Sequence, residues 1–187
     1  MASPDYREAD AIAVRATVKL LDGPLDLTRP TPCAGWDLGD LLAHMTIQHL
    51  GFAAAARGES WSLAQWAPRP LGADPAATYA AAASEVLDAF GSVDDLDGKI
   101  TLAEIAPVPI AAWRGISAHT IDYVVHGWDV AQALGKDWTL PEEVLVETRP
   151  IAEGVPETSK AFAAPIAAPP DASTMDMILL RLGRVPR

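Results

Sequence analysis

Cysteine and basic residues are scarce in this sequence. Cys33 is the only cysteine, so neither an intrachain disulfide nor a cysteine-rich zinc site can form. Lysine and arginine together number 14 against 25 acidic residues, giving a formal net charge of -11 at pH 7. An acidic surface repels nucleic acid and anionic lipid. The composition therefore favours small molecules or other proteins as partners.

Long apolar runs and several familiar motifs are also missing. No run approaches the roughly 20 apolar residues that span a bilayer, and residues 1–5 do not start a secretory signal. We therefore expect a cytoplasmic monomer or homodimer that binds neither nucleic acid nor membrane. The HExxH, GxxxxGK[ST] and GxSxG patterns of zinc proteases, nucleotide binders and serine hydrolases do not occur. Paired Glu-x-x-His helices of a di-iron bundle are absent too.

What the sequence does contain is a helical pattern. The 187 residues, half of them hydrophobic, suit one domain. Apolar residues at three- and four-residue spacing predict four long helices, over about 5–21, 37–57, 75–90 and 109–134. Their facing apolar stripes must be buried on one another, which favours a mainly α protein with an antiparallel four-helix bundle over about 5–135. We expect a short C-terminal extension, about 136–187, packed on that bundle.

Several local signals mark where these elements begin. Asp37 is a predicted N-cap of the second helix. Thr139 with Glu142, and Ser173 with Asp176, match the capping-box pattern and predict two further helices in the extension. Pro150 is expected to kink or end the first of these two helices. A short strand or extended segment is expected over residues 99–105.

The fourth helix carries the residues with the clearest chemistry. His119, Asp122 and His126 are spaced three and four apart, so their side chains project from one helix face. A metal site in a bundle also needs a ligand from a facing helix, and His44 lies beside the apolar stripe of the second helix. The sequence therefore predicts a metal site formed by His44, Asp122 and His126. The alternative is that these histidines are ordinary core or surface groups.

The predicted ligands indicate which ions would bind. Two imidazoles and one carboxylate suit Zn²⁺ best, with Ni²⁺ or Fe²⁺ also possible, and leave coordination positions open for water or substrate. Asp40 and Asp129 lie one helical turn from His44 and His126, so either carboxylate could accept the free ring N–H of a ligand. Cys33 precedes the second helix and is either a thiolate stabilised by that helix or a buried structural cysteine.

Two segments resemble a known family. One is Thr31-Pro32-Cys33-Ala34-Gly35-Trp36-Asp37, followed by Leu41-Leu42-Ala43-His44; the other begins Asp122-Tyr123-Val124-Val125-His126-Gly127-Trp128-Asp129. The chain resembles the DinB/YfiT-like metal-binding proteins, and more narrowly the actinobacterial proteins related to mycothiol-dependent maleylpyruvate isomerase. The resemblance implies a four-helix bundle whose zinc is held at His44, Asp122 and His126. The isomerase has Glu where this chain has Asp122, and its C-terminal domain is largely lacking here.

The resemblance also narrows the expected activity. It implies a metal-dependent thiol S-transferase or isomerase that uses mycothiol, or a similar small thiol, as co-substrate with an electrophilic substrate. His119 would then be the proton donor or base, unless it is a neighbour of the ligands or a surface group. Two alternatives stay open: a hydrolase that uses metal-activated water, and a metal or small-molecule binding module without turnover. The histidine on the apolar stripe of the second helix, His49, is expected to pack in the core.

Overall fold

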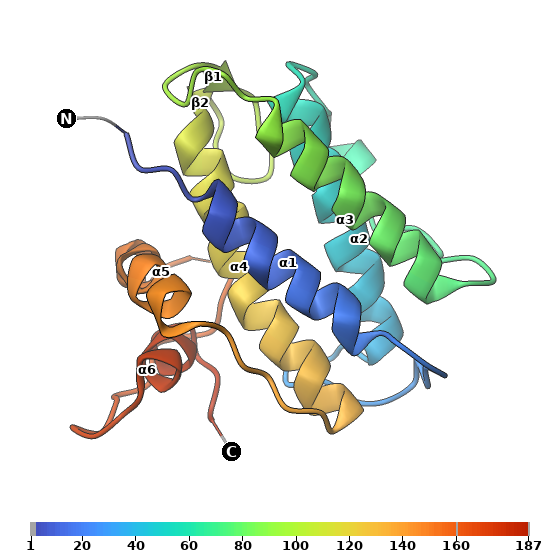
Figure 1. Cartoon of the computed structure of the whole chain (residues 1–187), viewed down its shortest axis with the longest axis vertical. Helices are drawn as coiled ribbons and strands as arrows, with labels where there is room; N and C mark the ends of the chain where they lie inside the picture. Colours follow the sequence, from blue (N-terminus) through green and yellow to red (C-terminus); the bar gives the residue numbers. More distant parts are fainter. Residues whose placement is uncertain (1–2, 160, 187) are drawn as a thin grey trace. The chain divides into compact units, whose positions relative to one another are not determined.

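The computed structural model describes residues 3–159 and 161–186 and is mainly helical (Figure 1). Its elements in chain order are α1 (Arg7–Leu20), α2 (Leu38–Ala56), the 3-10 helix η1 (Leu63–Trp66), α3 (Pro75–Gly91), β1 (Lys99–Ile100), β2 (Ile110–Ala111), α4 (Ala112–Leu134), α5 (Glu142–Gly154) and α6 (Thr174–Arg181). The strands pair antiparallel, Lys99 opposite Ala111 and Ile100 opposite Ile110. The predicted mainly α fold with four long helices is confirmed.

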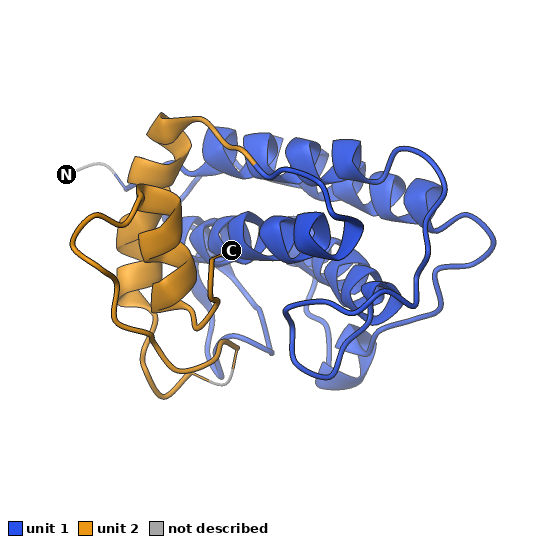
Figure 2. Cartoon of the chain, turned by 90° about the horizontal axis from the view of Figure 1, so that it is seen from below, with its two compact units in different colours: residues 1–138 blue, residues 139–187 orange. Residues whose placement is uncertain are grey.

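The chain divides into two compact units at Trp138 (Figure 2). The first unit contains α1 to α4 and the two short strands, and the second contains α5 and α6, which contact each other. All residues of the predicted metal site belong to the first unit.

In the first unit, α1 to α4 form a closed ring of neighbours. The helix α1 contacts α3 and α4, and α2 contacts the same two helices. Figure 1 shows α1 and α4 running in one direction and α2 and α3 in the other. The long connection over residues 57–74, which includes η1, returns the chain between the parallel helices α2 and α3. The two helices that carry the predicted ligands, α2 and α4, are therefore antiparallel neighbours.

The predicted signals at the start of α2 and of α6 are confirmed. The Asp37 carboxylate accepts a hydrogen bond from the backbone N–H of Asp40 at 2.9 Å, and the Asp40 side chain accepts one from Asp37 N–H, which completes a capping box at the start of α2. Ser173 and Asp176 form the same motif at the start of α6. Gly135 ends α4 with φ +66°, a left-handed conformation that glycine adopts without strain.

The capping box predicted for Thr139 and Glu142 is wrong. The helix α5 begins at Glu142 and its N-cap is Pro141, which makes no side-chain cap hydrogen bond. Thr139 is thus two residues before the N-cap position, while a capping box needs the N-cap and the third helical residue. Pro150 lies inside α5, which continues to Gly154, so it does not end the helix.

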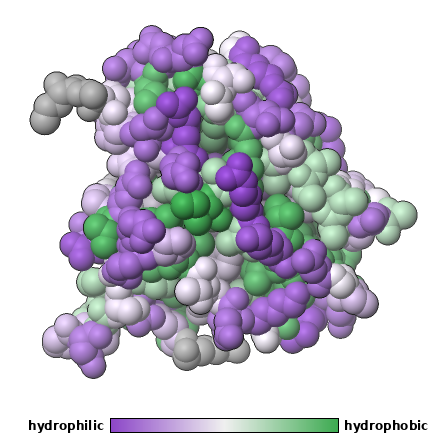
Figure 3. All heavy atoms as spheres, viewed as in Figure 1, coloured by the Kyte–Doolittle hydropathy of each residue, from purple (hydrophilic) through white to green (hydrophobic). Residues whose placement is uncertain are grey.

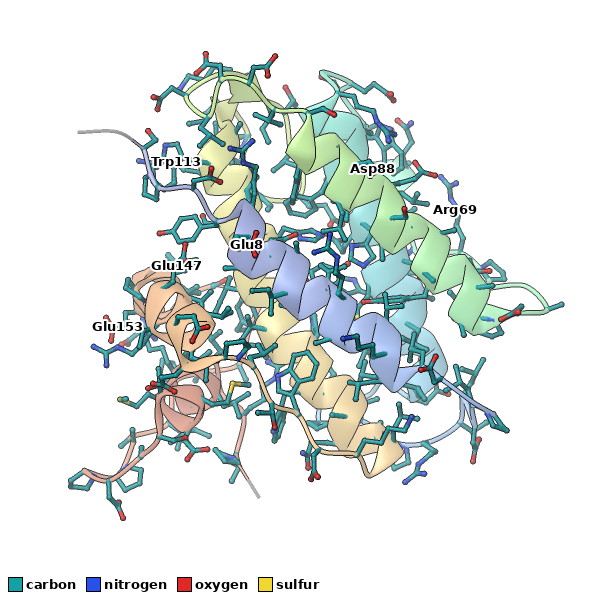
Figure 4. The ribbon with its side chains drawn as sticks, in the orientation of Figure 1. Glu8, Arg69, Asp88, Trp113, Glu147 and Glu153 are labelled. Atoms are coloured by element: carbon teal, nitrogen blue, oxygen red, sulfur yellow. The ribbon has the colours of Figure 1, made fainter. Side chains whose placement is uncertain are left out.

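The core of the first unit lies between the apolar faces of its helices. Fully buried members include Val14 from α1, Leu41 and Met45 from α2, Val86 from α3 and Val124 from α4. The acidic residues Glu8 and Asp88 are exposed on α1 and α3 (Figure 4). On the face drawn in Figure 3, hydrophilic and apolar side chains are interspersed. Among the described residues, no helix has the length and apolar character needed to traverse a bilayer.

Candidate metal centre

The structure brings His44, Asp122 and His126 together. Each offers one ligand atom, and these atoms lie within 4.8 Å of one another. Asp122 and His126 are one turn apart on α4, with Asp122 Oδ1 3.4 Å from His126 Nε2. His44 comes from the neighbouring helix α2, as the helix pattern predicted. The grouping is thus a feature of the fold, while binding of a metal by these three residues stays a prediction.

Aromatic rings lie close to His44, one of the two histidines of this group. The ring of Trp36, just before α2, lies 4.8 Å from that of His44, measured between centroids. The rings of His44 and His126 are 5.5 Å apart in an edge-to-face arrangement. Beside His126, a Cβ on Gly127 would overlap the ring of Trp138, so only glycine allows this indole to lie against α4. Both family-like segments therefore contribute residues that lie beside the candidate ligands.

His126 lies between two carboxylates. Its Nε2 faces Asp122, and its Nδ1 is 2.9 Å from Asp129 Oδ2. Burial by itself lowers the pKa of His126, but Asp122, Asp129 and Cys33 together raise it to about 10. In the metal-free protein this imidazole is therefore protonated at neutral pH. A cation at Nε2 would replace the positive charge that Asp122 and Asp129 otherwise balance on the protonated imidazole.

The remaining two ligand candidates differ in their environment. Burial lowers the pKa of His44, although the charge of Asp122 acts in the opposite direction, so its imidazole is neutral and has a free lone pair at neutral pH. The Asp122 side chain is 21 % exposed, whereas that of His126 is 5 % exposed. Solvent can therefore reach the group from the side of Asp122, as an open, reactive metal site requires.

Of the two carboxylates predicted to orient the histidines, Asp129 has the required contact. Asp129 is fully buried and lies against His126 Nδ1. Asp40 is exposed, and its side chain takes part in the capping box with Asp37. The position of Asp129 matches the common arrangement in which a carboxylate accepts the second N–H of a metal-binding histidine.

His119 lies in a separate buried cluster. Its Nδ1 is 2.6 Å from Asp10 Oδ1, and its Nε2 is 3.1 Å from Nδ1 of His49. All three side chains are completely inaccessible to solvent. The role of His119 as a proton donor stays a prediction, but a substrate would have to reach a side chain with 0 % exposure whose two nitrogens already have partners.

The buried cluster links three helices. Asp10 comes from α1, His49 from α2 and His119 from α4. The Tyr123 ring stacks on both imidazoles with centroids 4.1 Å apart, and its hydroxyl donates to the carbonyl of Met45. Burial, and then the neighbouring His119, hold the pKa of His49 well below its usual range. The expectation that His49 packs in the core agrees with its complete burial.

A second group of possible ligands was not anticipated from the sequence. Ligand atoms of Cys33, His126 and Asp129 also lie within 4.8 Å of one another. Cys33 is half-buried in the loop that leads into α2. Among the described residues, these three and the trio with His44 are the groups of three or more potential metal ligands.

One family model and one curated relative match the chain. A sequence model described as the mycothiol maleylpyruvate isomerase N-terminal domain matches residues 7–131. An uncharacterized protein of Mycobacterium tuberculosis, in the strains CDC 1551 / Oshkosh and H37Rv, is 27 % identical over 169 residues, covering 84 % of this chain and 85 % of the relative. No solved structure matches the chain.

Proposed function

The chain belongs to the mycothiol maleylpyruvate isomerase N-terminal domain family, and on this premise we propose that it is a metal-dependent thiol S-transferase or isomerase. Its co-substrate is a small thiol of the mycothiol type, and its second substrate is a small electrophile. The observation that carries the proposal is the convergence of His44, Asp122 and His126 beside a solvent-accessible carboxylate.

The three side chains fit a divalent ion of the zinc type. Zinc bonds of about 2.0 to 2.2 Å to nitrogen and oxygen imply ligand atoms roughly 3.3 to 3.6 Å apart in a tetrahedron. The separation of 3.4 Å between His126 Nε2 and Asp122 Oδ1 already falls in this range. The whole group lies within 4.8 Å, so at most a small side-chain adjustment brings His44 to this spacing. Zn²⁺ is thus the proposed ion, with Ni²⁺ or Fe²⁺ as alternatives.

When bound, such an ion stabilises the thiolate form of a thiol at neutral pH. The side chains around it have distinct proposed roles. Asp129 holds the ring of His126 by accepting its Nδ1–H. Trp36 covers one side of His44 and keeps water from that side. The exposed side of Asp122 is then the direction from which the thiol and electrophile enter.

His119 has a structural role in this proposal. Its hydrogen bonds to Asp10 and His49 lie in the fully buried core, so it does not touch substrate. It joins α1 and α2 to α4 close to the ligands, and so contributes to the spacing of α2 and α4. Protons released from the thiol pass to solvent on the open side of Asp122.

An assay of thiol consumption tests the proposed activity. The protein loaded with Zn²⁺ is mixed with mycothiol and the electrophile monobromobimane, and loss of free thiol is followed. We expect a rate above that of the metal-free protein, and loss of the increment in Asp122→Asn but not in Asp88→Asn, which changes an exposed carboxylate on α3. No rate above the metal-free control would overturn the proposal.

The same preparation separates the alternatives. Turnover of esters or amides without added thiol would point to a hydrolase using metal-bound water. Thermal stabilisation by mycothiol without either activity would point to a binding module.

A further inference from the structure

His126 belongs to two groups of potential ligands. On its Nε2 edge lies Asp122, 3.4 Å away, together with His44. On its Nδ1 edge lies Asp129, 2.9 Å away, and Cys33 completes the second group. The proposed function uses the first edge only. The second group presents a sulfur, a nitrogen and an oxygen donor. The proposed function gives Cys33 no role and uses Asp129 only to hold the His126 ring.

We propose that Cys33, His126 and Asp129 form a second cation site, selective for thiophilic ions of the Cd²⁺, Zn²⁺ and Cu⁺ class. The site goes beyond the proposed thiol chemistry and does not depend on it. A thiolate is a soft ligand that favours these ions over Mg²⁺, Ca²⁺ or Mn²⁺. The first group, which has two nitrogens and one oxygen, lacks that selectivity.

The donor atoms of the second site are close enough to share one ion. Metal bonds of about 2.0 Å to nitrogen and 2.3 Å to sulfur require ligand atoms roughly 3.3 to 3.8 Å apart. The atoms of Cys33, His126 and Asp129 lie within 4.8 Å of one another, so side-chain rotations suffice to bring them to that spacing. Three protein ligands leave a fourth position for water or a small thiol.

Burial makes the second site different from a chance surface cluster. Asp129 is completely inaccessible and His126 is 4 % exposed, so both donors are already removed from bulk water. The half-buried Cys33 is the side from which an ion can enter. Its backbone is held in place, because Cys33 N–H donates to Thr31 Oγ1 at 3.1 Å and its carbonyl accepts from Trp36 N–H.

Binding at the second site exchanges protons for the ion. The thiol proton of Cys33 and the Nδ1 proton of His126 leave to solvent, and the ion takes their place between sulfur, nitrogen and the Asp129 carboxylate. No electron is transferred. The competing interpretation is that Asp129 only orients His126 for the first site and that Cys33 is a structural thiol.

Cadmium titration distinguishes the two interpretations. Binding of Cd²⁺ to a thiolate produces an ultraviolet charge-transfer band, which nitrogen and oxygen ligands do not produce. We use His44→Ala, which removes a ligand of the first site and leaves the second intact. Further variants in that background are Cys33→Ser, Asp129→Asn and, as matched control, Asp88→Asn. Far-ultraviolet circular dichroism verifies that each variant is folded.

We expect the His44→Ala protein to develop the thiolate band with one equivalent of Cd²⁺. Cys33→Ser should abolish the band, Asp129→Asn should weaken Cd²⁺ binding about tenfold or more, and Asp88→Asn should leave it unchanged. No band, or a band whose titration Asp129→Asn does not alter, would overturn the second site. The thiol-transfer assay has a separate readout, the metal-dependent rate and its loss in Asp122→Asn, so failure of the second site and failure of the proposed function are distinguishable.

Discussion

Nδ1 of His126 lies 2.9 Å from Oδ2 of Asp129, its neighbour one turn farther along α4. In the metal-free protein this contact, together with Asp122, keeps the imidazole protonated. If an ion binds at Nε2 as proposed, the same contact would hold the imidazole ring in one orientation.

Replacing Asp129 by Asn should weaken metal binding at the first site without removing a ligand. Loss of a carboxylate behind a metal-binding histidine typically costs 10- to 100-fold in affinity. The experiment is done in the Cys33→Ser protein, so that the second group does not contribute, and Zn²⁺ affinity is measured by competition with a chromogenic chelator. Asp88→Asn serves as the control; an affinity equal to the control in Asp129→Asn would mean that this carboxylate does not orient His126.

The amount of bound Zn²⁺ should depend on the first group of ligands, which contains His44 and His126. Elemental analysis of Cys33→Ser protein prepared with Zn²⁺ should find one equivalent, and His44→Ala or His126→Ala should remove it. His49→Ala should keep the metal, because His49 belongs to the buried cluster with His119. Normal metal content in both ligand variants would refute the assignment.

The metal-free protein should be most stable near pH 6.5. The folded-state pKa values of His44 and His49 lie below the ordinary 6.5. As the pH falls, these side chains therefore bind protons more readily in the unfolded chain, and the free energy of unfolding decreases. The pKa of His126 is about 10, so its contribution to the free energy of unfolding is fully present below pH 6.5 and is lost as the pH rises toward 10.

Urea midpoints measured with a chelator from pH 5 to 10 test this profile. Each unit difference in bound protons changes the unfolding free energy by about 1.4 kcal/mol per pH unit. Saturating Zn²⁺ or His126→Gln should remove the decline on the alkaline side. A midpoint that stays constant from pH 6.5 to 9 in the metal-free wild type would contradict the prediction.

Gly127→Ala should destabilise the protein by about 1 to 3 kcal/mol, the usual range for overpacking a core. The added Cβ would overlap the ring of Trp138. Gly91, in α3, has nothing within 4 Å of its would-be Cβ, so Gly91→Ala should be neutral or slightly stabilising. Urea denaturation compares the two variants, and equal stabilities would show that the indole moves aside.

Asp10→Ala should destabilise the fold by about 3 kcal/mol, because it removes the partner of a buried histidine and leaves a polar atom of His119 unsatisfied. Metal content should nevertheless stay at the wild-type value at temperatures where the variant is folded. A loss of metal in folded Asp10→Ala would show that the buried cluster sets the ligand geometry more strongly than we propose.

The sequence was informative where helix geometry alone decides the outcome. Asp122 and His126 are four residues apart, so a helix necessarily brings them to one face. The position of His44 is predictable because this residue adjoins the apolar stripe of α2, and that stripe has to face the neighbouring helices. The start of α2 is marked by the N-cap residue Asp37, and the end of α4 by Gly135, which adopts a left-handed conformation.

Tertiary contacts were harder to predict. Asp10 lies in the first turn of α1, where an acidic residue normally stabilises the helix dipole at the surface, yet it is fully buried against His119. Two inward-facing histidines without a named partner, His49 and His119, were the available signal that such a carboxylate existed. The approach of Cys33 to His126 depends on the path of a loop held by Thr31 and Trp36, which no periodicity encodes.

The unit boundary at Trp138 has an evolutionary consequence. The family match ends at residue 131, and every candidate ligand precedes it. The chemistry of the metal centre and the segment after residue 138 can therefore diverge at different rates, because a change in one need not alter a ligand in the other.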